Sequence, residues 1–159
     1  MFNDFKVFFD YDGVLLDSEQ LIVQKQKESN LSWDDFFETL NWEELYRNAS
    51  EINNAFEILR ELQEKHNKLY ILTKIHNLIE ANVKIKLLRE EKILIPVFIV
   101  PPHTRKAEIY LPDSKSLLID DSQKNINDWC EHGGKGILFD ETALENNNNK
   151  VKSLHFLLR

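Results

Sequence analysis

The chain has 159 residues, of which 42% are hydrophobic and 11% aromatic, and it carries a formal net charge of -7. This length predicts one domain with room for a small subdomain, and the composition excludes disordered and fibrous proteins. The negative charge argues against a nucleic-acid polymer as the main partner. No apolar run approaches the about 20 residues that a membrane span needs. Cys130 is the single cysteine, so no internal disulfide can form, and we expect a cytoplasmic protein.

Short apolar strands alternate with amphipathic helices along most of the chain, which is typical of a parallel sheet with helices on both faces. We predict about five strands, at residues 6–9, 69–72, 95–100, 116–119 and 136–139. We predict helices from Ser50, as N-cap, to about residue 66, then at 76–90 and 151–158, with a loop at 146–149. The inner face of the second helix is predicted to hold Ile79, Val83, Leu87 and Leu88. The sequence therefore predicts a Rossmann-like α/β fold.

Residues 18–49 do not follow this alternation. They offer helix starts at Ser18, Ser32 and Asn41 but no strand, so we predict a small helical insert between core segments 1–17 and 50–159. The insert is rich in aromatic residues, namely Trp33, Phe36, Phe37, Trp42 and Tyr46. These side chains either form a miniature core or roof a pocket as a lid, and at least one of them is expected to contact the leaving group of a substrate.

Polar side chains follow four of the predicted strands. The first strand runs into Asp10-Tyr11-Asp12-Gly13, the second ends at Thr73, a loop bearing Lys106 follows the third, and the fourth ends at Asp120-Asp121. An Asp-Gly turn after a strand is ordinary by itself. However, the carboxyl ends of parallel strands meet at one edge of a sheet, where ligands bind in this architecture. Packing alone would not gather these carboxylates, a hydroxyl and an ammonium at one edge.

This set, in this order, resembles the haloacid dehalogenase (HAD) superfamily of phosphatases and phosphotransferases. Asp10 to Val14 resembles its first motif, Thr73 its second, Lys106 its third and Asp120-Asp121 its fourth. The stretch GVLLDSE from Gly13 to Glu19 is similar to members with helical caps. The stretch LLIDDSQKN from Leu117 to Asn125 is similar to the deoxyribonucleotidase branch. Lys74 departs from the small residue that often follows the second-motif threonine, and the insert is short for a nucleotidase cap.

The resemblance implies roles for these residues. Asp10 would be the nucleophile that forms an aspartyl-phosphate, and Asp12 the acid that protonates the leaving oxygen and then takes a proton from water. Mg²⁺ is the implied cofactor, a hard ion held by Asp10, Asp120 and Asp121 together with the backbone carbonyl of Asp12. Thr73 would bind phosphoryl oxygens, Lys106 would stabilise the negative charge, and Lys74 is a further substrate-binding candidate.

Several residues have competing interpretations. Asp121 could instead cap the helix that follows the fourth strand. Arg105 competes with Lys106, whereas Lys84 and Lys86 are more remote alternatives that we place on an exposed helix face. We expect His103 to be a surface bystander. Cys130 is predicted to be a buried small hydrophobic residue.

The most specific function consistent with the sequence is a Mg²⁺-dependent phosphatase acting on a small phosphorylated metabolite, with a nucleoside monophosphate as first candidate. A sugar-phosphate phosphatase or phosphotransferase is an alternative. A phospho-receiver domain, which also gathers aspartates, a threonine and a lysine, is rejected on the order of these residues. Such a domain has its lysine last, whereas here Lys106 precedes the Asp120-Asp121 pair. A catalytically silent phospholigand-binding module on the same fold remains a different class of hypothesis. The oligomeric state is left open by the sequence.

Overall fold

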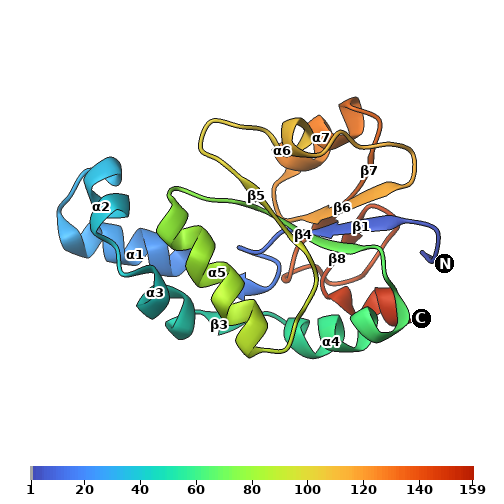
Figure 1. Ribbon diagram of the computed structural model, residues 1–159, viewed down its shortest axis with the longest axis horizontal. Coiled ribbons are helices and arrows are strands. Elements are labelled where there is room, and N and C mark those ends of the chain that lie inside the picture. Colours follow the sequence, from blue (N-terminus) through green and yellow to red (C-terminus); the bar gives the residue numbers. More distant parts are fainter. Residues whose placement is uncertain (1) are drawn as a thin grey trace.

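The computed structural model describes residues 2–159, and its centre is a six-stranded parallel sheet with strand order β5-β4-β1-β6-β7-β8 (Figure 1). The strands are β1 (Lys6–Phe9), β4 (Leu69–Lys74), β5 (Val97–Val100), β6 (Ser116–Asp120), β7 (Lys135–Phe139) and β8 (Lys150–Val151). On β1, Val7 lies opposite Leu69 of β4 and Leu117 of β6. The predicted fold class is confirmed, with one strand more than expected.

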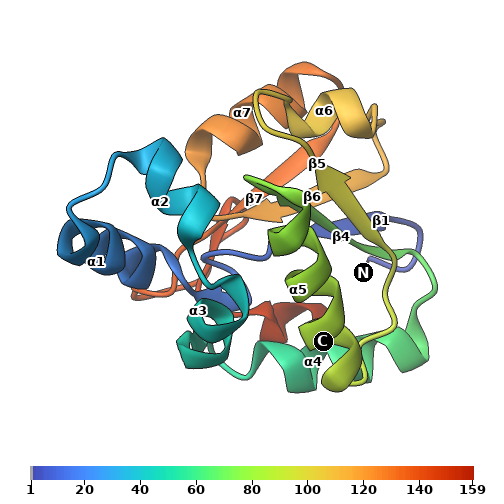
Figure 2. The ribbon, with the colours of Figure 1, turned by 60° about the vertical axis from the view of Figure 1, so that its left-hand side comes forward.

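Helices cover both faces of this sheet because successive strand residues point to opposite sides. Val7 and Phe9 belong to the larger core cluster, and Phe8 lies in the smaller one, where its ring is 5.2 Å from that of Trp129. Figure 2 shows the two helical layers on either side of the sheet. The larger cluster takes in α4 (Ala55–Lys65), α5 (Leu78–Glu90) and the 3₁₀ helix η1 (Leu154–Leu158), and the smaller one α6 (Lys106–Ile109) and α7 (Gln123–Glu131).

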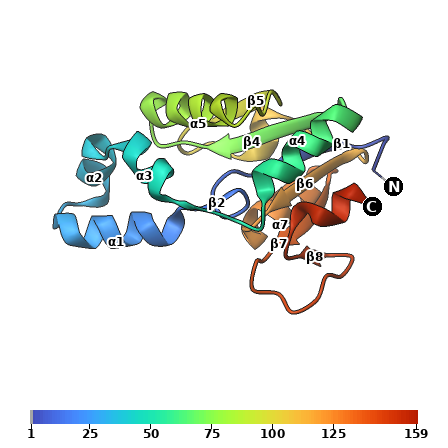
Figure 3. The same cartoon turned by 90° about the horizontal axis from the view of Figure 1, so that it is seen from below.

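The segment predicted to be helical contains three helices, α1 (Glu19–Ser29), α2 (Trp33–Thr39) and α3 (Trp42–Asn48). They begin after Ser18, Ser32 and Asn41, as expected. The chain enters and leaves the segment through an antiparallel pair of two-residue strands, β2 (Leu16–Asp17) and β3 (Ser50–Glu51). Figure 3 shows the three helices to one side of the sheet, with α3 close to α5.

Several predicted boundaries are wrong for identifiable reasons. Ser50 is no helix cap, because it pairs with Asp17 in the β2–β3 ribbon and α4 begins only after Asn54. The second helix begins after Asn77, whose side chain accepts a hydrogen bond from the backbone of Glu80. The third strand begins at Val97 rather than at residue 95, because Pro96 has no backbone N–H to donate to a neighbouring strand. The predicted closing helix is a short strand followed by a 3₁₀ helix, because Val151 pairs with Phe139 at the sheet edge.

Two side chains predicted to be buried are exposed. Ile79 is 64% exposed, because the inner face of α5 is formed by Glu80, Ala81, Lys84, Leu87 and Leu88. Cys130 is also exposed, while its neighbour Trp129 is fully buried and donates a hydrogen bond to the backbone of Ser116. Both errors come from assigning a helix face by hydrophobicity alone.

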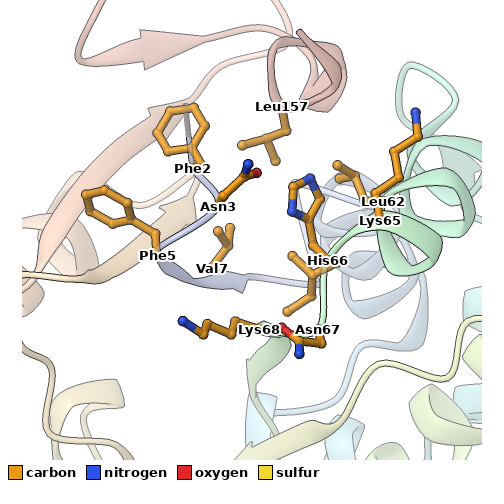
Figure 4. A pocket seen from close by; sticks show the side chains of 11 residues that line it. Phe2, Asn3, Phe5, Val7, Leu62, Lys65, His66, Asn67, Lys68 and Leu157 are labelled. Carbon is orange, nitrogen blue, oxygen red and sulfur yellow. The ribbon is translucent and has the colours of Figure 1, made fainter.

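The amino end of the sheet holds cavities that none of the predicted site residues lines. One cavity, of about 270 Å³, lies between the start of β1, the end of α4 and η1, and Figure 4 shows Val7, Leu62, His66 and Leu157 on its walls. A second, of about 800 Å³, lies near the start of β7 and the loop at 146–149. Within residues 2–159, no helix combines the length and apolar character needed to cross a membrane.

Candidate active site

The carboxyl end of β1 delivers Asp10 and Asp12 to the edge of the sheet. The backbone N–H of Asp10 donates to the carbonyl of Ile119 at 3.0 Å, which continues the pairing with β6 and fixes the start of the turn. Gly13 has a φ of +79°, and a Cβ at this position would overlap the carboxylate of Asp121. Glycine is therefore required twice here, for the left-handed backbone and for the close approach of Asp121.

Asp10, Asp120 and Asp121 form one acidic cluster, in which one oxygen of each carboxylate lies within 4.8 Å of the others. Burial, followed by the charge of Asp120, raises the pKa of Asp10 to about 7. Burial, followed by the charges of Asp10 and Asp120, raises the pKa of Asp121 to about 8. Three clustered carboxylates that repel one another supply the hard oxygen donors that a divalent cation such as Mg²⁺ prefers.

Lys106 is the cation that joins two members of this cluster. Its ammonium lies 2.6 Å from Asp120 Oδ2 and 2.9 Å from Asp10 Oδ1, and its side chain is 3% exposed. Burial alone would lower the pKa of Lys106, but the charges of Asp10 and Asp120 raise it. Lys106 opens the short helix α6 rather than lying in a loop as predicted, so its backbone is fixed in a helical turn.

The second cation of the site is Lys84, which the sequence analysis wrongly placed on an exposed helix face. Its side chain is completely buried, and its ammonium donates to Asp12 Oδ2 at 2.7 Å. The other oxygen of Asp12 accepts from the hydroxyls of Ser18, at 2.6 Å, and Tyr46, at 2.9 Å. Burial would raise the pKa of Asp12, but Lys84 and these hydroxyls hold it below its ordinary value. The side chain of Asp12 is therefore held by Lys84, Ser18 and Tyr46, and it is not one of the three carboxylates of the acidic cluster.

Thr73 and Lys74 lie at the end of β4, beside Lys84. Thr73 is buried, and its hydroxyl oxygen accepts a hydrogen bond from Lys84 at 2.9 Å. Lys74 is exposed, and its ammonium lies 3.4 Å from Asn125 Oδ1 on α7. Asn125 also donates to Asp120 Oδ2 at 3.1 Å, so it links the rim of the site to the acidic cluster. The structure thus brings Asp10, Asp12, Thr73, Lys106, Asp120 and Asp121 to one edge of the sheet, with Lys74 at its rim.

The competing interpretations of single residues are settled by geometry. The N-cap of α7 is Ser122, which accepts from the backbone of Asn125, so Asp121 is no cap. Arg105 is half exposed and pairs with Asp128 at 3.0 Å, away from the acidic cluster. Lys86 is exposed on α5 and pairs with Glu43. His103 is exposed on the loop after β5, as expected.

The sequence analysis missed Glu80, which is 1% exposed, and named its neighbour Lys84 only as a remote alternative on an exposed helix face. Glu80 Oε2 lies 3.4 Å from the Lys84 ammonium, and Glu80 Oε1 lies 2.8 Å from the Nδ1 atom of His76. One signal could have indicated their burial: Glu80 lies four residues before Lys84, and Lys84 lies three residues before Leu87 and four before Leu88, so the four share one helical face. A charged pair within an apolar stripe indicates a buried pair.

The aromatic residues of the insert divide into two groups. Phe36, Trp42 and Tyr46 are buried, whereas Trp33 is 45% exposed and Phe37 is half-buried. The Phe37 ring stacks on His76 with centroids 3.7 Å apart. Trp42 and Tyr46 belong to the larger core cluster, and the Tyr46 hydroxyl also contacts Asp12. Packing and a position near the site thus both occur among these side chains.

No protein-family model and no curated protein sequence matches the chain. Solved structures do match. A HAD hydrolase of family IA from Entamoeba histolytica has a TM-score of 0.65 and 15% identity, with 96% of this chain and 94% of that chain covered. A HAD hydrolase from Bacillus subtilis bound to magnesium has a TM-score of 0.62 and 14% identity, with 95% of each chain covered.

A third match is a phosphoserine phosphohydrolase-like protein from Francisella tularensis, with a TM-score of 0.61, 12% identity, and coverage of 97% of this chain and 98% of that chain. At these identities the similarity establishes the fold. The chain therefore has the fold of HAD-superfamily hydrolases, with matches that cover 95–97% of its length.

Proposed function

We propose that this protein is a Mg²⁺-dependent phosphomonoesterase that acts through an aspartyl-phosphate on a small phosphorylated metabolite. The observation that carries the proposal is the separation of two carboxylates on one strand end. Asp10 lies in the acidic cluster with Lys106, whereas Asp12 lies with Lys84, Ser18 and Tyr46. One carboxylate is thus available to a metal and a phosphorus atom, and the other to the leaving group.

The proposed reaction has two balanced halves. An oxygen of Asp10 bonds to phosphorus, the bond from phosphorus to the leaving oxygen breaks, and Asp12 in its acid form gives that oxygen a proton. Water then attacks phosphorus, Asp12 takes the proton of that water, and the Asp10–phosphorus bond breaks. In the free protein Asp12 is ionised. The negative charge of a bound phosphate favours its protonation, because like charges raise the pKa of a carboxyl group.

The remaining groups stabilise charge. Bound Mg²⁺ would supply positive charge to the phosphoryl oxygens, and Asp10, Asp120 and Asp121 would hold it, with the Asp12 backbone carbonyl as a further ligand. Lys106 balances the charge of Asp10, while Thr73 and Lys74 are proposed to bind the phosphoryl group or the substrate near it. The insert, residues 18–49, is proposed to act as a cap over this edge.

For the substrate we propose a nucleoside monophosphate, because of the similarity of residues 117–125 to the deoxyribonucleotidase branch and the aromatic side chains of the insert. Sugar phosphates are the second candidate, with a phosphotransferase as the related reaction. A silent binding module is disfavoured by the complete set of Asp10, Asp12, Lys106 and Asp120 at one edge of the sheet, three of them buried.

The test is release of phosphate from 4-nitrophenyl phosphate with and without Mg²⁺, followed by a panel of nucleoside monophosphates and sugar phosphates. We expect turnover that requires Mg²⁺ and is absent in Asp10→Asn. A wild-type protein that binds phosphate esters but never turns them over would instead support the silent binding module.

A further inference from the structure

Lys84 is the most deeply buried charged side chain next to the candidate site, and none of the motifs that define the site contains it. It has 0% exposure, and its ammonium makes hydrogen bonds to Asp12 Oδ2, Thr73 Oγ and the carbonyl of Lys74, at 2.7, 2.9 and 2.9 Å. An ammonium group has three N–H donors and no acceptor. All three donors are therefore used, and each acceptor belongs to β4 or to the turn after β1.

The surroundings of Lys84 keep it charged. Burial would lower the pKa of Lys84, but the charges of Asp12 and Glu80 raise it. The Tyr11 and Tyr46 rings lie with their centroids 5.2 and 5.5 Å from the ammonium, within the range of cation–π contacts. Replacing a buried ion pair by apolar side chains often stabilises a protein. The burial of this ammonium among so many partners therefore indicates a role other than stability.

We propose that Lys84 is a positioning residue that fixes both Asp12 and Thr73 for phosphoryl transfer, an inference that rests on the proposed function above. Towards Thr73, the ammonium can only donate, so the threonine oxygen accepts and its own hydrogen is left for an acceptor. In the structure the nearest such acceptor is the Lys74 carbonyl, at a long 3.4 Å. A phosphoryl oxygen is a better partner, because charged acceptors make stronger hydrogen bonds.

Towards Asp12, Lys84 fixes the rotation of the carboxylate. Oδ2 is held by the ammonium while Ser18 and Tyr46 hold Oδ1, so the plane of the group is set from both sides. Proton transfer to a leaving oxygen depends on the position of this carboxylate. Helix α5 thereby ties the acid from β1 and the hydroxyl from β4 into one unit.

The test is Lys84→Met, which keeps the length of the side chain and removes its charge, measured on two aryl phosphates of similar size. 4-Nitrophenolate leaves readily without a proton, whereas the departure of phenolate depends more strongly on receiving one. If Lys84 positions Asp12, kcat/KM should fall at least tenfold further for phenyl phosphate than for 4-nitrophenyl phosphate. The matched control is Lys86→Met on the exposed face of the same helix, which should change neither substrate by more than about twofold.

No loss on either substrate would overturn the role of Lys84 and make it a structural ion-pair partner. An equal loss on both would overturn its action through Asp12, because positioning of Thr73 affects the phosphoryl group that both substrates share. If Lys84→Met does not fold, the double variant Asp12→Asn with Lys84→Met removes both charges of the pair. In this double variant, kcat/KM for 4-nitrophenyl phosphate divided by kcat/KM for phenyl phosphate should equal the value for Asp12→Asn alone. A lower value of this ratio would contradict action through Asp12. Absence of turnover in the wild-type protein is a separate result that refutes the proposed function itself.

Discussion

The two ends of the parallel sheet are built on opposite principles. At the amino end, the apolar side chains of Val7 and Leu62 are buried beside the cavity in Figure 4, while Lys65 and Lys68 at its rim are exposed. At the carboxyl end, Asp10, Lys84 and Asp120 are charged and buried. Burying charges costs free energy even when they are paired, whereas burying apolar groups is the main source of stability. The contrast supports the proposal that the carboxyl end carries the chemistry, while the apolar amino end stabilises the fold.

The largest effect that would sharpen this contrast is expected from Asp10→Asn. Because the variant removes the proposed nucleophile and a metal ligand, turnover should fall at least about 1,000-fold. Its melting temperature should stay equal or rise, since one of three mutually repelling carboxylates is gone. The measurement is steady-state phosphate release together with thermal unfolding. Activity close to the wild-type value would refute the role of Asp10.

At the amino end, Leu62→Ala is expected to lower stability and to leave activity unchanged. Leu62 is 1% exposed and lines the cavity shown in Figure 4, so its truncation should lower the free energy of unfolding by about 2–5 kcal/mol. At a temperature where the variant is fully folded, kcat/KM should be unchanged. Denaturant unfolding and activity measured on the same samples would check this. A specific loss of activity in the folded variant would show that the two ends are coupled.

The sequence could predict most of the fold and most of the candidate site, because both follow from local patterns. Residues 6–9 are apolar and end at a turn, and parallel strands then bring Asp10, Thr73 and Asp120 to one edge. The errors arose where a long-range contact overrides the local pattern. Ile79 was placed inside and Lys84 outside, because the face of α5 was assigned by hydrophobicity alone. The partner of the Lys84 ammonium, Asp12, lies 72 positions away in the sequence, so no local pattern identifies it. Val151 likewise becomes a strand only because Phe139 lies beside it.

The acidic cluster predicts a pH-dependent response to Mg²⁺. The pKa values of Asp10 and Asp121 are raised to about 7 and about 8, so the stability they contribute without metal is present at low pH and lost as pH rises through these values. Mg²⁺ binds the ionised forms, so the rise in melting temperature that it causes should be larger at pH 8.5 than at pH 5.5. At 100 times its Kd the cation should add about 2.7 kcal/mol.

The matched control for this response is Asp113→Asn. Asp113 is an exposed carboxylate at the amino end, paired with Lys6 at 2.8 Å and outside the acidic cluster. The variant should keep the full Mg²⁺ response, whereas Asp121→Asn should lose most of it. A Mg²⁺ effect of equal size at both pH values would argue against a site made of these carboxylates.

The smallest effect expected concerns the surface of the insert, which belongs to neither end of the sheet. Trp33 is 45% exposed and stacks on Phe37, whose ring in turn lies on His76, two residues beyond the end of β4. If this exposed surface contacts the leaving group, Trp33→Ala should reduce kcat/KM for a nucleoside monophosphate about tenfold, or 1.4 kcal/mol, with little change for 4-nitrophenyl phosphate.

Phe36→Ala is the matched control, since Phe36 is 4% exposed and packs inside the insert. Its loss should lower the melting temperature and leave the ratio between the two substrates unchanged. If the two variants behave alike, the aromatic residues of the insert only hold it together, and substrate selectivity must come from the rim around Lys74 and Asn125.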